Sequence, residues 1–165
     1  MTDYKMLTKQ ILALAEDEPF FVPVLSNASA LLYENMEDIN WVGFYIMDKG
    51  SLVLGPFQGK VACIRIPMGR GVCGTAAVND KTLLVPDVHK FAGHIACDGA
   101  SNSEIVIPMH CQGKVVGVLD IDSPSLDRFK FEDQAGLEYF IKEMEQVTDF
   151  CRFGDALLEE NGTLI

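Results

Sequence analysis

Three cysteines with glycines close by are the residues of this chain most able to do chemistry. Cys63, Cys73 and Cys97 lie in the segments Gly59-Lys-Val-Ala-Cys63, Gly69-Arg-Gly-Val-Cys73-Gly-Thr75 and Gly93-His-Ile-Ala-Cys97-Asp98-Gly99. The neighbouring glycines leave the backbone free to move, so pairs of these sulfur atoms could come together. A thiolate is a good nucleophile and exchanges with disulfides. The pattern therefore predicts thiol redox chemistry.

Cys97 is expected to be exposed, because it lies in a long polar segment, residues 87–102. Long loops in compact domains are usually functional. Such a thiol titrates at about 8.5 and reacts as the thiolate, so a nearby cation or amide would help it. His94 is either such a neighbour or a histidine in solvent. Together with Cys63 and Cys73, these two residues lack the paired short spacings of zinc sites, so no metal is expected.

Two carboxylates form a second candidate group. Asp120 and Asp122 are two residues apart in an expected strand, so both side chains should project from one face. Glu104 lies on the expected partner strand of the same hairpin. Crowded carboxylates raise one another's pKa, and one of them can then keep a proton to donate near neutral pH. The alternative is that the two aspartates simply end the strand at the surface.

Trp41 begins another expected strand and is the only tryptophan of the chain. Most single tryptophans belong to the core. One at a strand end can instead form the wall of a pocket and pack against a methyl or thioether group. Both interpretations stay open from the sequence.

The remaining cysteines, Cys111 and Cys151, have no glycine-rich surroundings, and we interpret both as structural or incidental. The chain has five cysteines, an odd number, and its first residues lack a secretory signal pattern. Mostly reduced thiols are therefore expected, rather than a framework of structural disulfides.

Composition restricts the partners. The net charge is -11, from 24 acidic against 13 basic residues, and the basic residues are scattered singly. This charge disfavours nucleic acids and anionic membranes as partners. The apolar stretches are shorter than the roughly 18 residues that a membrane span needs. We expect a soluble, cytoplasmic protein.

Apolar periodicity predicts alternating groups of helices and strands. Helices are expected over residues 3–15, 23–33, 74–79 and 132–150. Strands are expected over residues 41–47, 51–54, 63–67, 83–85, 104–109 and 114–122. Hairpin turns are expected at Asp48-Lys-Gly50 and at Gln112-Gly113.

This order of elements predicts an α+β fold, an antiparallel sheet with helices against its faces. A chain of 165 residues with 48% hydrophobic and 22% charged residues is typical of one globular domain. We divide residues 1–165 into a helical start (1–36), a catalytic core (37–150) and a tail (151–165).

Seven segments follow one another in the chain: Asn40-Trp-Val-Gly-Phe-Tyr45, Leu54-Gly-Pro-Phe-Gln-Gly-Lys-Val-Ala-Cys63, Gly69-Arg-Gly-Val-Cys73-Gly-Thr-Ala-Ala77, Val85-Pro-Asp-Val88, Gly93-His-Ile-Ala-Cys97-Asp98, Ser103-Glu-Ile-Val-Ile-Pro108 and Gly117-Val-Leu-Asp-Ile-Asp122. In this order they resemble the free methionine-(R)-sulfoxide reductases, which are built on a GAF domain. The resemblance runs from about Asn27 to Met144. It implies a central antiparallel sheet of about six strands, a homodimer, and a free amino acid as substrate.

The resemblance also implies roles for the cysteines. Cys97 matches the catalytic cysteine, Cys63 the resolving cysteine that forms a disulfide with it, and Cys73 an auxiliary cysteine in recycling. Cys111 and Cys151 have no counterpart in the pattern. The implied activity is the thiol-dependent reduction of free L-methionine-(R)-sulfoxide to L-methionine, with no cofactor and with thioredoxin as reductant.

The implied substrate pocket consists of Trp41, Glu104, Asp120 and Asp122. The carboxylates match groups that bind the polar atoms of the substrate and its sulfoxide oxygen, and Trp41 matches the wall around the methyl group. Cys97 would attack the sulfoxide sulfur while Glu104 or Asp122 gives a proton to the departing oxygen. Cys97 would become a sulfenic acid that Cys63 resolves to a disulfide.

Two other functions stay open. A ligand-sensing GAF module would hold a small molecule in the same pocket without consuming thiols. A redox sensor would lose thiols to peroxide but not to methionine sulfoxide. The sequence leaves open whether Cys63 or Cys73 resolves first, and whether Glu104 or Asp122 holds the proton.

Overall fold

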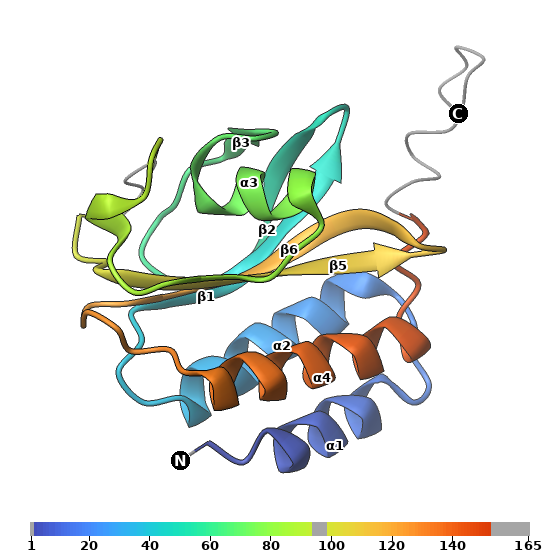
Figure 1. The fold of residues 1–165 in the computed structure, drawn as a ribbon. Coiled ribbons are helices and arrows are strands. Elements are labelled where there is room, and N and C mark those ends of the chain that lie inside the picture. Colours follow the sequence, from blue (N-terminus) through green and yellow to red (C-terminus); the bar gives the residue numbers. More distant parts are fainter. Residues whose placement is uncertain (1, 94–98, 153–165) are drawn as a thin grey trace.

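A computed structural model of the chain describes residues 2–93 and 99–152 (Figure 1). Its centre is a six-stranded antiparallel sheet with the strand order β3-β2-β1-β6-β5-β4. The strands are β1 (Trp41–Asp48), β2 (Ser51–Gly59), β3 (Arg65–Pro67), β4 (Leu83–Val85), β5 (Ser103–Cys111) and β6 (Lys114–Ser123). The predicted α+β class and the predicted antiparallel sheet are confirmed.

Helices cover the two faces of the sheet unequally. In the described part of the chain they are α1 (Tyr4–Ala15), α2 (Phe21–Asn35), α3 (Gly71–Asn79), the short 3-10 helix η1 (Val88–Lys90) and α4 (Phe131–Val147). Helices α2 and α4 lie against one face of the sheet, α1 packs on both of them further out, and α3 lies on the opposite face (Figure 1). None of these helices has both the length and the apolar composition that crossing a membrane requires.

The two hairpin turns are those predicted from the sequence. Lys49 and Gly50 join β1 to β2 with φ of 46° and 75°, and Gln112 and Gly113 join β5 to β6 with φ of 50° and 74°. Consecutive positive φ values are typical of the two-residue turns that suit the twist of a hairpin. The first turn therefore fixes the register of β1 against β2, and the second that of β5 against β6.

Strand β2 is longer than predicted, since it continues to Gly59 instead of ending at Leu54. Proline is tolerated at position 56 because β3 pairs only with Ser51–Val53. The later part of β2 therefore has a paired strand on one side only, as an edge strand does. Ser29 of α2 donates a hydrogen bond to the carbonyl of Pro56 at 3.1 Å. Strand β3, in contrast, is shorter than the predicted residues 63–67.

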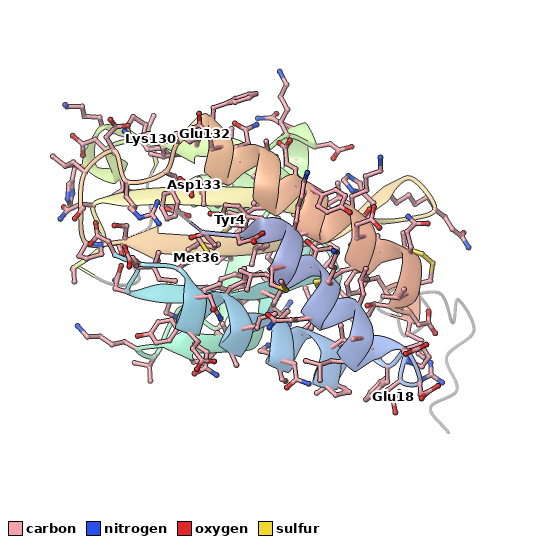
Figure 2. The ribbon with its side chains drawn as sticks, turned by 90° about the horizontal axis from the view of Figure 1, so that it is seen from below. Tyr4, Glu18, Met36, Lys130, Glu132 and Asp133 are labelled. Carbon is pink, nitrogen blue, oxygen red and sulfur yellow. A yellow bond between two sulfur atoms is a disulfide. The ribbon has the colours of Figure 1, made fainter. Side chains whose placement is uncertain are left out.

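Helices α1 and α4 are joined by one polar contact. The hydroxyl of Tyr4 donates to Asp133 Oδ1 at 2.5 Å (Figure 2). Arg128 forms an ion pair with Asp133 at 3.1 Å. Asp133 Oδ2 also accepts from the backbone N–H of Lys130 at 2.8 Å, which caps the start of α4. Gly136 faces the Tyr4 ring so closely that a Cβ would lie 2.2 Å from it. The two helices therefore need glycine at this crossing.

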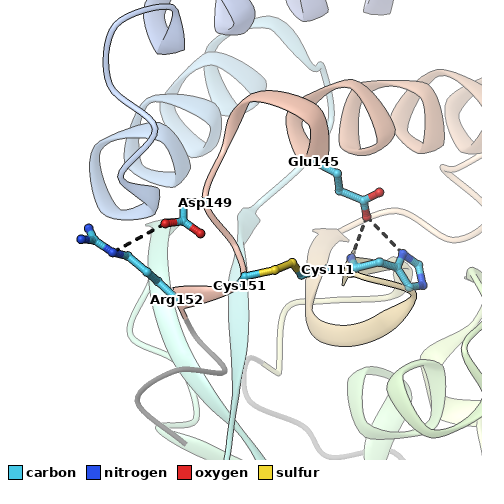
Figure 3. The surroundings of a disulfide bond; sticks show 6 residues. Cys111, Glu145, Asp149, Cys151 and Arg152 are labelled. Atoms are coloured by element: carbon cyan, nitrogen blue, oxygen red, sulfur yellow. Dashed lines mark hydrogen bonds and ion pairs between the residues drawn. A yellow bond between two sulfur atoms is a disulfide. The ribbon is translucent and has the colours of Figure 1, made fainter. Parts of the chain in front are cut away.

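A disulfide joins Cys111 at the end of β5 to Cys151 beyond α4, with the Cα atoms 5.4 Å apart (Figure 3). Cys63 is also disulfide-bonded. The expectation of mostly reduced thiols is therefore wrong for the described cysteines. The helix predicted to reach residue 150 ends at Val147, and the chain then turns so that Phe150 enters the core with 1% of its surface exposed. This turn brings Cys151 to Cys111.

The Cys111–Cys151 disulfide should stabilise the fold by restricting the unfolded chain over a separation of 40 residues. We expect the Cys111→Ser/Cys151→Ser double variant to lose about 2–4 kcal/mol of unfolding free energy under oxidising conditions. Urea unfolding followed by circular dichroism measures this difference.

The matched control is the same pair of proteins in excess dithiol, where the difference should disappear. Equal unfolding midpoints under oxidising conditions would show that this bridge does not stabilise the protein.

Candidate active site

The register of three adjacent strands gathers the predicted carboxylates. Glu104 of β5 lies directly opposite Asp122 of β6, and Asp122 lies opposite Trp41 of β1. Asp120 lies on the same face of β6, while Ile121 between them belongs to the core under α2 and α4. The predicted sharing of one sheet face is confirmed.

Two of these acids are buried. Glu104 is 6% exposed and Asp120 is 7% exposed, whereas Asp122 is half-buried. The alternative that both aspartates end the strand at the surface is therefore wrong for Asp120. The acids lie under α3, on the face of the sheet that this helix covers.

A cavity opens between α3, the segment before β3 and the sheet. It contains five of the seven residues predicted for the site, namely Trp41, Cys73, Glu104, Asp120 and Asp122. The rest of its lining is mostly apolar, with one arginine and one tyrosine: Tyr45, Val61, Ala62, Ile66, Arg70, Gly71, Val72 and Ser101. The lining suits a small molecule that is partly apolar and partly charged.

Trp41 is both a core residue and a pocket wall, so the two interpretations of the sequence hold together. It is 3% exposed and stacks on Phe57, with ring centroids 5.3 Å apart. Its Nε1 donates to the carbonyl of Lys60 at 3.0 Å. A Cβ on Gly43 would lie 2.3 Å from Phe57 Cβ and 2.6 Å from the Trp41 ring, so only glycine leaves room for this stack.

Tyr45 and Arg70 were not identified from the sequence. Tyr45 lies on the Trp41 face of β1, and its hydroxyl donates to the carbonyl of Cys63 at 3.0 Å. The period of two along β1 placed Tyr45 on the same face as Trp41, and that signal could have found it. Arg70 precedes α3, and its place in the lining depends on how that helix packs, which no local pattern shows.

Cys73 lies in the first turn of α3 and is 3% exposed. It is the free cysteine among the described residues, and its thiol donates to Glu104 Oε1 at 3.9 Å. Burial, followed by the charges of Asp120 and Glu104, raises the pKa of Cys73 well above its usual value. This cysteine is therefore a protonated thiol at neutral pH. The glycine after it, Gly74, serves close packing, since a Cβ there would lie 2.5 Å from the carbonyl of Pro67.

Cys63 is half-buried and lies before β3 rather than in it. The carbonyl of Cys63 is held by Tyr45, so the wall of the cavity and this cysteine are directly linked. Cys97 and His94 belong to residues 94–98, which lie outside the described residues. The predicted nucleophile is thus not placed. Among described residues near this segment, Gly93 accepts a hydrogen bond from the N–H of Gly71, and both Gly71 and Ser101 line the cavity.

Burial dominates the electrostatics of the cavity. Desolvation, then the charges of Asp120 and Asp122, raises the pKa of Glu104 well above its usual range. Desolvation raises the pKa of Asp120 from 3.8 to about 6. The raised pKa favours the protonated form of Glu104, which is the state that a proton donor needs. Cys73, Glu104 and Asp120 also place three ligand atoms within 4.8 Å of one another, a spacing that one divalent cation could bridge.

Comparison with known proteins identifies the family to which the chain is similar. The GAF domain model matches residues 22–147. The chain is 52% identical over 153 residues to the free methionine-R-sulfoxide reductase of Escherichia coli (strain K12), covering 91% of this chain and 93% of that protein.

Two solved structures that hold substrate are similar to this one. The structure of fRMsr of Staphylococcus aureus in complex with substrate has a TM-score of 0.84 and 51% identity, covering 88% of this chain and 95% of the other. The free methionine-R-sulfoxide reductase from Neisseria meningitidis in complex with its substrate has a TM-score of 0.85 and 42% identity, covering 90% of each chain.

The raised pKa of Asp120 makes stability depend on pH. Between its ordinary pKa of 3.8 and its folded value of about 6 the folded state binds more protons than the unfolded state, so stability falls as pH rises through this window. We expect Asp120→Asn to gain stability relative to wild type between pH 4 and pH 8, by at most about 3 kcal/mol. Urea unfolding at several pH values measures this gain.

Asp17→Asn, at an exposed acid, is the matched control and should keep the wild-type profile. Parallel pH profiles for wild type and Asp120→Asn would contradict the raised pKa.

Proposed function

The chain belongs to the free methionine-R-sulfoxide reductases, oxidoreductases built on a GAF domain, and from this membership we propose that it reduces free L-methionine-(R)-sulfoxide to L-methionine with its own thiols. The observation that carries the proposal is the cavity, in which Glu104, a buried acid with a raised pKa, lies beside two aspartates and an aromatic wall. We also propose a thioredoxin-type reductant, a homodimer and a cytoplasmic location.

The cavity suits each part of this substrate. The apolar faces of Trp41 and Tyr45 fit the methyl and methylene groups next to the sulfur. Asp120 and Asp122 fit the α-ammonium group, since a buried carboxylate gains most from a cation. Arg70 fits the α-carboxylate. A methionine within a protein chain has neither of these charges, so the same contacts favour the free amino acid.

Glu104 is our proposed proton donor, in preference to Asp122. Glu104 is 6% exposed and its pKa is raised by burial, so the proton is held until the reaction needs it. Asp122 is half-buried and stays closer to solvent. Protonation of the sulfoxide oxygen, otherwise a very poor leaving group, assists breaking of the S–O bond as this oxygen is transferred to Cys97.

In the following steps the thiols of the protein supply the electrons that reduce the sulfoxide. The Cys97 thiolate attacks the sulfoxide sulfur, methionine leaves, and the oxygen ends on Cys97 as a sulfenic acid. The Cys63 thiol then attacks the Cys97 sulfur, and water leaves as the disulfide forms. A dithiol reductant reopens this disulfide by thiol exchange.

Cys63 rather than Cys73 is our proposed resolving cysteine. Two observations support this choice: Cys63 is disulfide-bonded, and Cys73 is a buried thiol whose pKa is raised, which makes it a poor nucleophile. Tyr45 ties the Cys63 segment to the wall of the cavity through a hydrogen bond at 3.0 Å. Cys73 is then left as a structural neighbour of Glu104.

The assignment of the cysteines is tested with both sulfoxide epimers. Cys97→Ser should form no methionine from the R epimer, and Cys63→Ser should form about one methionine per protein and then stop, because its sulfenic acid is not resolved. Product counting under excess dithiol, together with a sulfenic acid probe, measures both.

Cys73→Ser is the matched control and should keep multiple turnovers. Multiple turnovers by Cys97→Ser would end the assignment of the nucleophile. Binding of the sulfoxide without loss of thiols in wild type would favour a ligand sensor instead.

The proton donor is tested by Glu104→Gln, which keeps the size of the side chain but cannot donate an acidic proton. We expect kcat to fall about 10²- to 10⁴-fold, the usual contribution of general acid catalysis. In wild type, kcat should fall as pH rises through the raised pKa of Glu104, and in the variant this dependence should be lost.

The exposed acid Glu132 supplies the control variant Glu132→Gln, which should behave as wild type. Full activity in Glu104→Gln would remove the proton-donor role.

A further inference from the structure

The floor of the cavity holds an unusual group of donors. Cys73 Sγ and one carboxylate oxygen each from Glu104 and Asp120 all lie within 4.8 Å of one another, and all three residues are buried. Asp120 Oδ1 is buried and has no hydrogen-bond partner among the described residues, although its side chain lines the cavity. A buried oxygen without a partner is costly in free energy. The fold therefore keeps one donor atom ready for a ligand.

The three donors are close to the geometry of a metal site. With Zn–S of about 2.3 Å and Zn–O of about 2.1 Å, the ligand atoms of a tetrahedral site are about 3.5 Å apart. Cys73 Sγ and Glu104 Oε1 are 3.9 Å apart. Rotation of these side chains would have to close the remaining gap.

The kinds of donor atom restrict the cation. One thiolate with two carboxylates suits Zn²⁺ and the softer Cd²⁺, whereas Mg²⁺ and Ca²⁺ prefer oxygen ligands alone. The charge also fits, because binding ionises Cys73 and Glu104 beside Asp120, and a divalent cation offsets the repulsion among the three negative charges. Three protein ligands leave a fourth position for water, the arrangement of an open zinc site.

We propose that the reduced protein binds one Zn²⁺-class cation at the floor of the cavity through Cys73, Glu104 and Asp120. The thiol of Cys73 and the carboxylic acid of Glu104 release their protons to solvent as the ligands bind. The cation occupies the space between α3 and the sheet and leaves Glu104 without a proton to donate. Inhibition that is relieved by methionine sulfoxide follows, a consequence that rests on the proposed function, whereas the binding itself does not.

Zinc X-ray absorption on the wild-type protein tests the ligand set directly. The protein is reduced, freed of dithiol without air, and loaded with less than one equivalent of Zn²⁺. We expect one sulfur at about 2.3 Å and the remaining ligands to be oxygen at about 2.0–2.2 Å. Two or more sulfur ligands would mean that the other cysteines form the site, and oxygen or nitrogen ligands alone would mean surface binding. Either result overturns the proposal.

Cd²⁺ titration, followed by the ultraviolet charge-transfer band of a cadmium thiolate, tests the same set by substitution. Cys73→Ser should lose the band of the tightest site, and Asp120→Asn should keep the thiol but bind at least about 10-fold more weakly, the loss expected when even an indirect partner is removed. Circular dichroism of each variant shows whether it folds.

Asp80→Asn is the matched control, since Asp80 pairs with His110 outside the cavity, and it should bind as wild type. Unchanged affinity in folded Asp120→Asn would overturn the proposal. A lack of turnover in the free methionine sulfoxide assay would leave both binding measurements standing, so failure of the proposed function is distinguishable from failure of the metal site.

Discussion

Burial of two carboxyl groups beside a thiol is the constraint on which the site depends. Glu104 and Asp120 are 6% and 7% exposed, and Cys73 lies over them on α3. Acids in such a position would separate if the chain allowed it. Their strands prevent this because Ile105 and Ile121, a neighbouring pair that points to the opposite face of the same two strands, are fully buried under α2 and α4. The hydrophobic core on one face of the sheet thus keeps the two acids together on the other face, although their proximity is unfavourable.

The aromatic wall depends on a second constraint, the absence of a side chain at Gly43. The pairing of β1 with β2 shifts register between Gly43 and Tyr45, and irregularities of this kind redirect side chains. Trp41 stacks on Phe57 across this point and on Tyr45 along the strand, with centroids 5.3 and 5.9 Å apart. The wall and the Cys63 segment are then directly connected, because the Tyr45 hydroxyl donates a hydrogen bond to the carbonyl of Cys63.

Local patterns predicted the elements and part of the site. The period of two along β6 placed Asp120 and Asp122 on one face, and the turn at Gln112-Gly113 brought Glu104 opposite. Properties that arise from long-range packing were not predicted. The burial of Cys73 depends on how α3 closes over the sheet, and the Cys111–Cys151 bridge depends on the turn after Val147. The glycines near Cys73 suggested mobility, but the packing of Gly74 against Pro67 shows that they also permit close contact.

The same electrostatics suit both of the ligands that we propose for the cavity. A pocket with Glu104, Asp120 and Asp122 in its lining has more acidic than basic groups, Arg70 being the basic residue among its described lining. Its energy falls when a positive charge enters, whether this is the ammonium group of a free amino acid or a divalent cation. The ammonium group leaves Glu104 free to stay protonated, whereas a metal ion displaces that proton. The proposed reaction therefore requires the first ligand to be favoured over the second. Cys73 distinguishes the two proposals, because its buried thiol would bind the metal ion but is not used in the reaction.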